Sequence, residues 1–175
     1  MTERMTQNDA PSTAARPVLA LAEREGEAIW FLDTLITVKV RDANGADFGL
    51  VEYQMPRGSR TPFHRHEAED EAMYVLEGEL RVVLGDRAIV AGPGAYVHLP
   101  RGVAHGLEAL TEARLLVLSR PDGFVEFARE FGTPAPQHEL PPPAAPDFER
   151  LEALARKYRI ELLGPLPDVA PPHAS

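Results

Sequence analysis

The 175-residue sequence predicts an all-β protein, a sandwich or barrel of antiparallel strands. Roughly eight short segments rich in β-branched and aromatic residues follow one another, and glycine- or proline-containing turns separate most of them. No helical pattern of 10–15 residues lies between these segments, which argues against a parallel α/β architecture. Amphipathic helical patterns appear only after residue 120.

The expected strands are short, and most of them end at a turn signal. The first segment, residues 28–40, is long enough for one or two strands, and the hairpin-type dipeptide Asn44-Gly45 follows it. Further strands are expected at residues 48–55, 72–76, 80–84, 88–90, 95–99, 107–110 and 113–119.

Two helices are expected near the C-terminus. Residues 123–131 place their apolar side chains on one helical face, and Gly132 follows in the C′ position that glycine favours. Asp147 is a candidate N-cap for a second amphipathic helix, which Gly164 and Pro165 end. The chain is thus expected to comprise a disordered N-terminus (1–16), a β-barrel (17–120), a helical region (121–164) with a proline-rich linker (133–146), and a proline-rich tail (165–175).

Composition excludes several classes of function. The 18 basic and 27 acidic residues leave a net charge of −9, which argues against binding to nucleic acid or to anionic lipid. The absence of cysteine excludes disulfides, thiolate metal sites and cysteine nucleophiles. The polar N-terminus is not a secretory signal, and no apolar run approaches the length of a membrane span. We therefore expect a cytoplasmic protein with no nucleic-acid or membrane partner.

Two segments, Gly58–Gly78 and Gly94–His105, carry most of the chemical information. Because side chains alternate along a strand, the two histidines of the HRH sequence project to one side. Together the segments supply three imidazoles and one carboxylate, which suit a first-row divalent ion and leave one or two positions for substrate, oxygen or water. The alternative is a solvated charged surface, because several acidic residues flank HRH. The residues concerned are His64, His66, Glu71 and His105.

The spacing of these residues resembles the two signature motifs of the cupin superfamily. In the first motif five residues separate Gly58 from His64, and His66, Glu71 and Gly78 follow at the family's intervals. The second motif runs from Gly94 through Pro100 and Gly102 to His105, after an inter-motif stretch of fifteen residues that is typical of microbial single-domain cupins. One departure is Ala109, which stands where the second motif often ends in asparagine; this position is variable in the family.

This resemblance implies an antiparallel jelly-roll barrel with one divalent transition metal ion inside it. By motif position the metal ligands are His64, His66, Glu71 and His105. Glu69 competes with Glu71 for the carboxylate role because both have the same parity, and Glu71 is preferred because it begins a pattern resembling E-x-x-Y-V-L-E-G. The ion itself is not specified, since Ni, Mn, Fe, Co, Cu and Zn all accept these ligands.

A finer resemblance covers residues 28–168 and links the chain to quercetinase-like single-domain cupins of actinobacteria. Such proteins resemble flavonol 2,4-dioxygenases, which cleave the heterocycle of a flavonol with O2 and release carbon monoxide. The resemblance implies a small aromatic molecule and O2 as partners, no organic cofactor, and Glu71 as the catalytic base for the substrate hydroxyl. Alternatives are a non-oxidative metallo-cupin, such as a polyketide cyclase, isomerase or decarboxylase, or a small-molecule-binding cupin without catalysis.

Less specific expectations concern the surroundings of the site. Parity and composition nominate five residues as lining the cavity or its mouth, although each can equally belong to the barrel core: Phe63, Met73, Val75, Tyr96 and His98. His98 is either a hydrogen-bond partner or a structural histidine, whereas His138 and His173 are expected to be exposed. The helix at 123–131 either covers the barrel mouth as a lid or simply packs against the barrel.

A homodimer is also expected. Cupin barrels commonly dimerise, in some cases through N-terminal strands that join the partner's sheet. The apolar stretch IWFLDTLITVKV, within residues 28–40, suits this role because an exposed edge of this character invites pairing with another chain.

Overall fold

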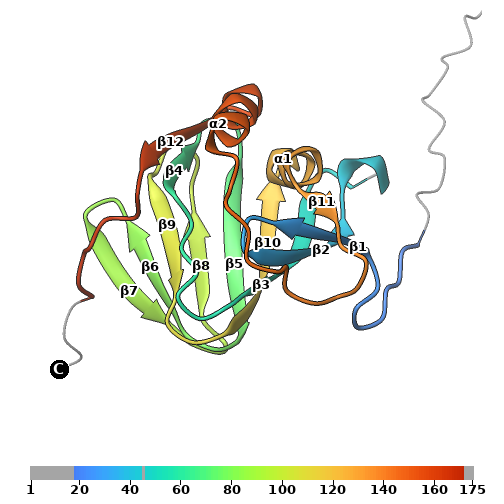
Figure 1. The fold of residues 1–175 in the computed structure, drawn as a ribbon, viewed down its shortest axis with the longest axis horizontal. Coiled ribbons are helices and arrows are strands. Elements are labelled where there is room, and N and C mark those ends of the chain that lie inside the picture. The colour runs from blue at the N-terminus through green and yellow to red at the C-terminus, as the bar shows by residue number, and fades with distance from the viewer. Residues whose placement is uncertain (1–17, 45, 172–175) are drawn as a thin grey trace, which may run out of the picture.

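The computed structural model describes residues 18–44 and 46–171, and it shows two antiparallel β-sheets packed face to face (Figure 1). The larger sheet contains, in order, β11 (Thr133–Pro134), β1 (Glu27–Phe31), β2 (Thr34–Val40), β3 (Gly49–Met55), β10 (Ala113–Arg120), β5 (Asp70–Glu77) and β8 (Tyr96–Leu99). The smaller sheet contains β12 (Ile160–Gly164), β4 (Phe63–His66), β9 (His105–Ala109), β6 (Leu80–Leu84) and β7 (Arg87–Ala91). This arrangement is the predicted all-β jelly roll.

The core lies between the two sheets and follows from the alternation of side chains along the strands. In β3, buried and half-buried residues alternate without interruption, so Val51, Tyr53 and Met55 all point inward. Leu115 of β10, which pairs with Tyr53, is fully buried beside them. These inward faces form one continuous apolar cluster that also includes residues of both helices.

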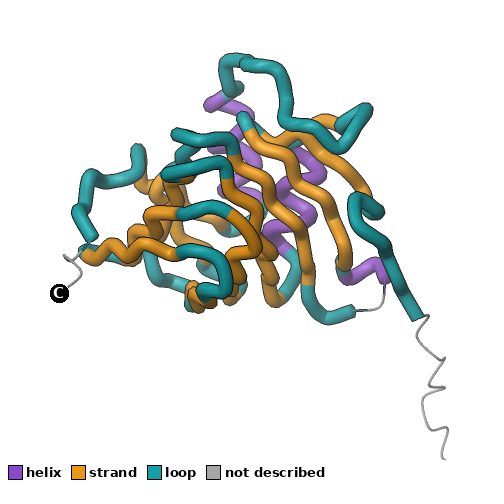
Figure 2. Tube along the Cα trace, turned by 90° about the horizontal axis from the view of Figure 1, so that it is seen from below, coloured by secondary structure: helices purple, strands orange, loops and turns teal. Residues whose placement is uncertain are grey.

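Both helices lie at one end of the sandwich, at the top of Figure 1 and behind the strands in Figure 2. Helix α1 (Gly123–Phe131) has the predicted bounds, and it buries Val125, Phe127, Ala128 and Phe131 against the barrel. Helix α2 (Phe148–Lys157) begins after Asp147, whose side chain accepts a hydrogen bond from the backbone N–H of Arg150 at 3.0 Å, as a capping residue should.

Gly132 ends α1 in a different conformation from the one expected. Its backbone is extended, with φ −71° and ψ −178°, rather than left-handed as at a typical C′ glycine. Glycine is required there for a different reason. A Cβ atom would overlap the side chain of Ile29 and would lie 2.7 Å from the carbonyl oxygen of Trp30.

Three short strands lie outside the predicted ranges: β4, which the alternation of side chains in HRH presupposed, and β11 and β12, which were not expected. Strand β11 falls within the predicted linker and pairs with β1, and β12 falls within the predicted helical region and pairs with β4. Strand β1 is therefore not a free edge, and most of β2 is buried within the barrel. Strands β1 and β2 therefore do not form the exposed apolar edge that was expected to pair with a second copy of the chain. The homodimer itself stays a prediction.

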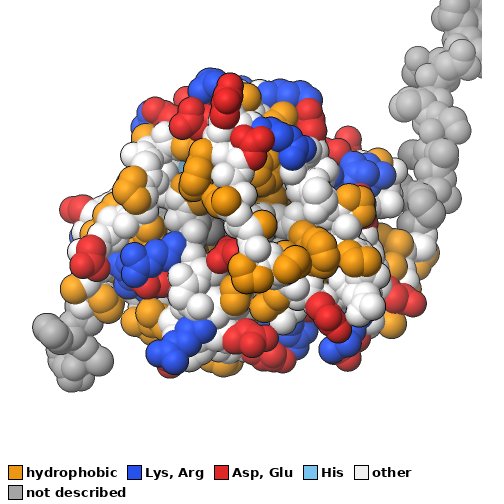
Figure 3. All heavy atoms as spheres, in the orientation of Figure 1, with side chains coloured by type: hydrophobic (Ala, Val, Ile, Leu, Met, Phe, Trp, Pro, Cys, Tyr) orange, Lys and Arg blue, Asp and Glu red, His pale blue; other side chains and the backbone are white. Residues whose placement is uncertain are grey.

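Several predictions fall on residues outside the described part of the chain. These are the disordered segment 1–16, Gly45 of the hairpin dipeptide, and the end of the proline-rich tail with His173. Among the helices of residues 18–44 and 46–171, none has the length and apolar character needed to cross a membrane. On the face seen in Figure 3, acidic and basic side chains are interspersed and do not form one patch of either sign.

Gly78, between β5 and β6, is a specific structural requirement. Its φ is +76°, and an added Cβ would overlap the carbonyl oxygen of Glu112, whereas Gly85 has φ +58° with open space around its Cβ position. Replacing Gly85 by alanine should cost about 1–2 kcal/mol of unfolding free energy for the left-handed backbone alone. Gly78→Ala should cost roughly 1–3 kcal/mol more because of the overlap. Urea unfolding of both variants tests this, and equal losses would contradict the prediction.

Candidate metal centre

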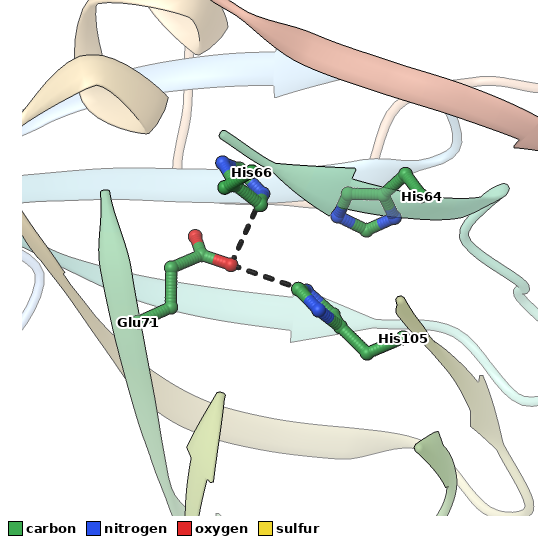
Figure 4. Close-up of side chains that lie close together, drawn as sticks. All are labelled: His64, His66, Glu71 and His105. Carbon is green, nitrogen blue, oxygen red and sulfur yellow. Dashed lines mark ion pairs between the residues drawn. The ribbon is translucent and has the colours of Figure 1, made fainter. Parts of the chain in front are cut away.

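Three strands from the two sheets bring four chemically active side chains together (Figure 4). His64 and His66 project from β4 to the same side, His105 comes from β9, and Glu71 comes from β5 in the opposite sheet. His64 is paired directly with His105 in the β4–β9 ladder, which places their rings 4.5 Å apart. One candidate ligand atom from each residue lies within 4.8 Å of all the others.

The distances within this cluster fit a shared metal ion. One oxygen of Glu71 lies 3.1 Å from Nε2 of His66 and 3.3 Å from Nε2 of His105. Metal–ligand bonds of about 2.1 Å place neighbouring ligand atoms about 3 Å apart. The observed separations therefore correspond to adjacent positions around one centre.

Hydrogen bonds fix the orientation of two imidazoles. Nδ1 of His64 lies 2.8 Å from the carbonyl oxygen of Pro62, and Nδ1 of His105 lies 3.1 Å from that of Val103. A carbonyl oxygen only accepts, so each Nδ1 carries the proton and donates. When such a ring carries only this proton, its Nε2 keeps a lone pair that faces the other candidate ligands.

The third imidazole is held by a carboxylate. Nδ1 of His66 lies 2.5 Å from Oε1 of Glu69, and its Nε2 is buried without a hydrogen-bond partner. A buried polar atom without a partner is unfavourable unless something else satisfies it, and here it faces the carboxylate of Glu71. Three inward Nε2 atoms and one carboxylate oxygen suit a divalent transition metal ion, so the residues present fit the group that the motifs imply.

The site keeps Glu71 ionised and His64 neutral. Burial opposes the charged form of Glu71, but His66 and His105 outweigh it and hold the pKa of this carboxyl at about 2. Burial, together with the neighbouring His105 and His66, lowers the pKa of His64 to about 3. Both groups are therefore in the protonation state that a metal ligand needs at neutral pH.

His66 behaves differently because it stands between two acids. Burial disfavours its protonated ring, but the carboxylates of Glu71 and Glu69 outweigh burial and raise its pKa above the usual range. In the metal-free protein, this ring therefore holds its proton at a higher pH than an ordinary histidine. A metal ion has to displace that proton.

A cavity of about 70 Å³ adjoins the four residues. Its wall is mainly apolar and combines aromatic side chains with aliphatic residues from both sheets and both helices. Phe124 and Phe127 of α1 belong to this wall, and each packs its ring edge to face against Phe31 at 6.2 and 5.5 Å. Helix α1 is therefore a packed part of the cavity wall.

Of the five predicted pocket residues, only Met73 lines this cavity. Val75 shares its face of β5 and is fully buried, but it lies two residues farther from Glu71 and belongs to the barrel core. Phe63 alternates with His64 along β4, so it points to the other side and packs beside Val83 and Leu166.

Tyr96 and His98 lie on the outer face of the larger sheet. In the β5–β8 ladder, Tyr96 pairs with Tyr74 and His98 pairs with Ala72, which alternate with the inward Met73. Tyr96 is 65% exposed, and His98 is also exposed. The prediction that these two side chains line the cavity is wrong, because it assigned the wrong parity to β8.

Sequence reasoning missed several residues of the wall. Tyr53 comes from β3, just before the first motif. Leu151 from α2, and Ile160 and Leu162 from β12, are distant in sequence from both motifs. Only their apolar spacing marked these residues, and that spacing is equally typical of residues in a hydrophobic core.

The prediction for His138 also differs from the structure. This histidine was expected to be exposed, and it is half-buried.

The segment that holds this site matches a known protein family. Residues 51–119 match the family model described as "Cupin domain". These residues include all four candidate ligands. The match and the jelly-roll fold together support the resemblance of this chain to the cupin superfamily.

Individual proteins similar to this chain share less than a third of their aligned residues with it. Quercetin 2,3-dioxygenase of Bacillus subtilis is 28% identical over 134 residues, which is 75% of this chain but only 40% of that protein's length. The structure of the polyketide cyclase RemF from Streptomyces resistomycificus is 31% identical and aligns with 70% of this chain and 81% of that one, with a TM-score of 0.47. An RmlC-like cupin from Shewanella frigidimarina is 19% identical, with a TM-score of 0.52 over 61% of this chain and 94% of that one.

Every metal-dependent function considered for this protein requires that the chain binds a metal ion. The His64→Ala/His66→Ala variant should lose nearly all metal, whereas the wild-type protein should hold about one divalent ion per chain. His98→Ala is the matched control, because this histidine lies on the outer face of the barrel. Elemental analysis of the three purified proteins makes the measurement. Equal metal content in all three would overturn the site assignment.

Metal uptake should release a proton in a defined pH range. His66 must lose its proton because its pKa is raised, whereas Glu71 and His64, with pKa values of about 2 and about 3, are already deprotonated in this range. At pH 6.5 up to about one proton should leave per ion bound, and the number should fall towards zero as the pH rises through the raised pKa of His66. Apparent affinity should rise over the same range. Calorimetry in buffers of different ionisation enthalpy tests this, and heats independent of the buffer at pH 6.5 would contradict it.

Proposed function

We propose that the protein is a metal-dependent dioxygenase that acts on a flavonol-like or related aromatic enol. The observation that carries the proposal is the cluster of three histidines and one glutamate at an apolar, aromatic-walled cavity. The similarity of this chain to quercetin 2,3-dioxygenase, which extends over 75% of the chain, supports this reaction. Small aromatic molecules and O2 are the proposed partners.

A bound divalent ion would act as a Lewis acid that lowers the pKa of a coordinated hydroxyl group. In the proposed reaction, Glu71 accepts the proton of the substrate's enol hydroxyl at one carboxylate oxygen. This carboxylate is 5% exposed and is ionised at neutral pH, so its lone pairs are available. Its low pKa makes it a weak base, which suits only an acidified hydroxyl.

The rest of the cavity orients the substrate and excludes water. The rings of Phe31, Phe124 and Phe127 offer apolar surface to a flat aromatic molecule. Pockets for molecules of this size usually measure about 300–1,000 Å³, well above the cavity of about 70 Å³. Admission of a flavonol therefore requires the wall to move outward. The parts of the wall outside the sheets are the two helices and the loop residues Leu32, Thr61 and Pro62.

Turnover in air gives the direct test. The metal-loaded protein, incubated with quercetin and a panel of related enols, should consume O2 while the substrate absorbance falls. Glu71→Gln should lower the rate per bound ion at least about 100-fold, because it removes the proton acceptor. Glu67→Gln removes the same charge from an exposed side chain and should leave the rate unchanged. Metal content is measured for every variant so that ion loss is separated from loss of the base.

Two results would contradict this function. One is the absence of O2 consumption with every member of the panel despite full metal loading. The other is substrate turnover at the same rate without O2, which would indicate non-oxidative Lewis-acid chemistry at the same centre.

A further inference from the structure

Glu69 is a buried carboxylate that lies outside the four candidate ligands. It precedes β5 and is only 2% exposed. Its two oxygens have different partners: Oε1 lies 2.5 Å from Nδ1 of His66, and Oε2 accepts a hydrogen bond from the backbone N–H of Phe124 at 2.9 Å. One side chain thus contacts both a candidate metal ligand and the first turn of α1.

The contact with α1 replaces an ordinary helix cap. Asp122 occupies the N-cap position, but its side chain makes no capping hydrogen bond, so a carboxylate 55 residues distant in sequence from Phe124 satisfies that N–H. In its ionised form this carboxylate also interacts favourably with the helix dipole. Gly123 leaves the space for it, since a Cβ there would lie 2.9 Å from Oε2 of Glu69.

The contact with His66 determines which ring nitrogen faces the cluster. While the carboxylate accepts from Nδ1, the Nε2 of the neutral ring keeps the lone pair that a metal ion requires. The same Glu69 anchors Phe124, whose ring lines the cavity and lies 6.4 Å from the ring of His66. Ligand orientation and the position of the cavity wall therefore depend on one carboxylate.

We propose that Glu69 is a positioning residue that couples His66 to helix α1, so that the metal ligand and the aromatic wall are held in place together. The part of this inference that concerns the orientation of His66 as a metal ligand rests on the proposed metal site. The anchoring of α1 by Glu69 applies to the protein with or without metal.

A carboxylate can perform both tasks, and an amide cannot. Glutamine has one acceptor oxygen and one NH2 donor. If its oxygen accepts from Phe124, its NH2 faces Nδ1 of His66 and favours the ring form with the proton on Nε2. If its oxygen accepts from His66 instead, its NH2 opposes the N–H of Phe124. Glu69→Gln must therefore weaken metal binding or loosen the start of α1, although its shape is conserved.

The test compares Glu69→Gln with Glu67→Gln, which removes the same charge two residues away from an exposed position. Calorimetric titration with a single divalent ion such as Ni²⁺ measures affinity, and NMR measures amide hydrogen exchange of Phe124 in the metal-free proteins. For Glu69→Gln we expect metal affinity to fall on the order of 10- to 100-fold, or exchange at Phe124 to rise by a similar factor. Glu67→Gln should resemble the wild type in both.

A second variant, with its substitution on α1, tests the coupling between this helix and His66. Gly123→Ala leaves Glu69 and His66 unchanged, but its methyl group displaces the carboxylate. Metal affinity should fall in this variant as well, although the substitution lies on α1. This readout separates coupling from a purely local role of Glu69.

Two outcomes would overturn the proposal. The first is a Glu69→Gln protein that keeps both wild-type metal affinity and wild-type exchange at Phe124. The second is wild-type metal affinity in Gly123→Ala. Failure of the wild-type protein to bind any divalent ion would instead refute the proposed function, and exchange at Phe124 in the metal-free variants would still decide the anchoring of α1.

Discussion

The antiparallel pairing of β4 with β9 is the constraint on which the candidate site depends. This pairing sets His64 beside His105, and the alternation of side chains along β4 brings His66 to the same side. A shift of one residue in this register would turn the two histidines of β4 away from the interior. The fourth group, Glu71, comes from the opposite sheet, so the site also requires that the two sheets pack against each other.

Much of this arrangement could be predicted because it depends on local pattern. The strand periods, the turn glycines and the spacing of the HRH motif are all local, and the four side chains that they nominate do lie together. The helix bounds at 123–131 were predictable for the same reason, since an amphipathic stripe ends there at a glycine.

What the sequence could not supply depends on contacts between distant segments. The pairing of β8 with β5 turns Val97 and Leu99 inward and Tyr96 and His98 outward, and only the apolar alternation of Val97 and Leu99 was a local sign of it. The wall residue Ile160 lies in a strand that forms only by pairing with β4, about one hundred residues earlier in the chain. The role of Glu69 depends on the N-terminus of α1 being adjacent, and parity alone left it as a competitor of Glu71.

The pairing of β12 with β4 also has a consequence for the order of assembly during synthesis. Ile160 pairs with His66 and Leu162 with His64, so the strand that carries two candidate ligands has one neighbour near the C-terminal end of the described chain. A ribosome releases His64 long before it releases Ile160, and in that interval this edge of β4 has no partner. Products that stop before residue 160 would keep all four candidate ligands yet lack one wall of the cavity. The cavity wall beside β4 is therefore complete only once residues 160–164 have been made and have paired with this strand.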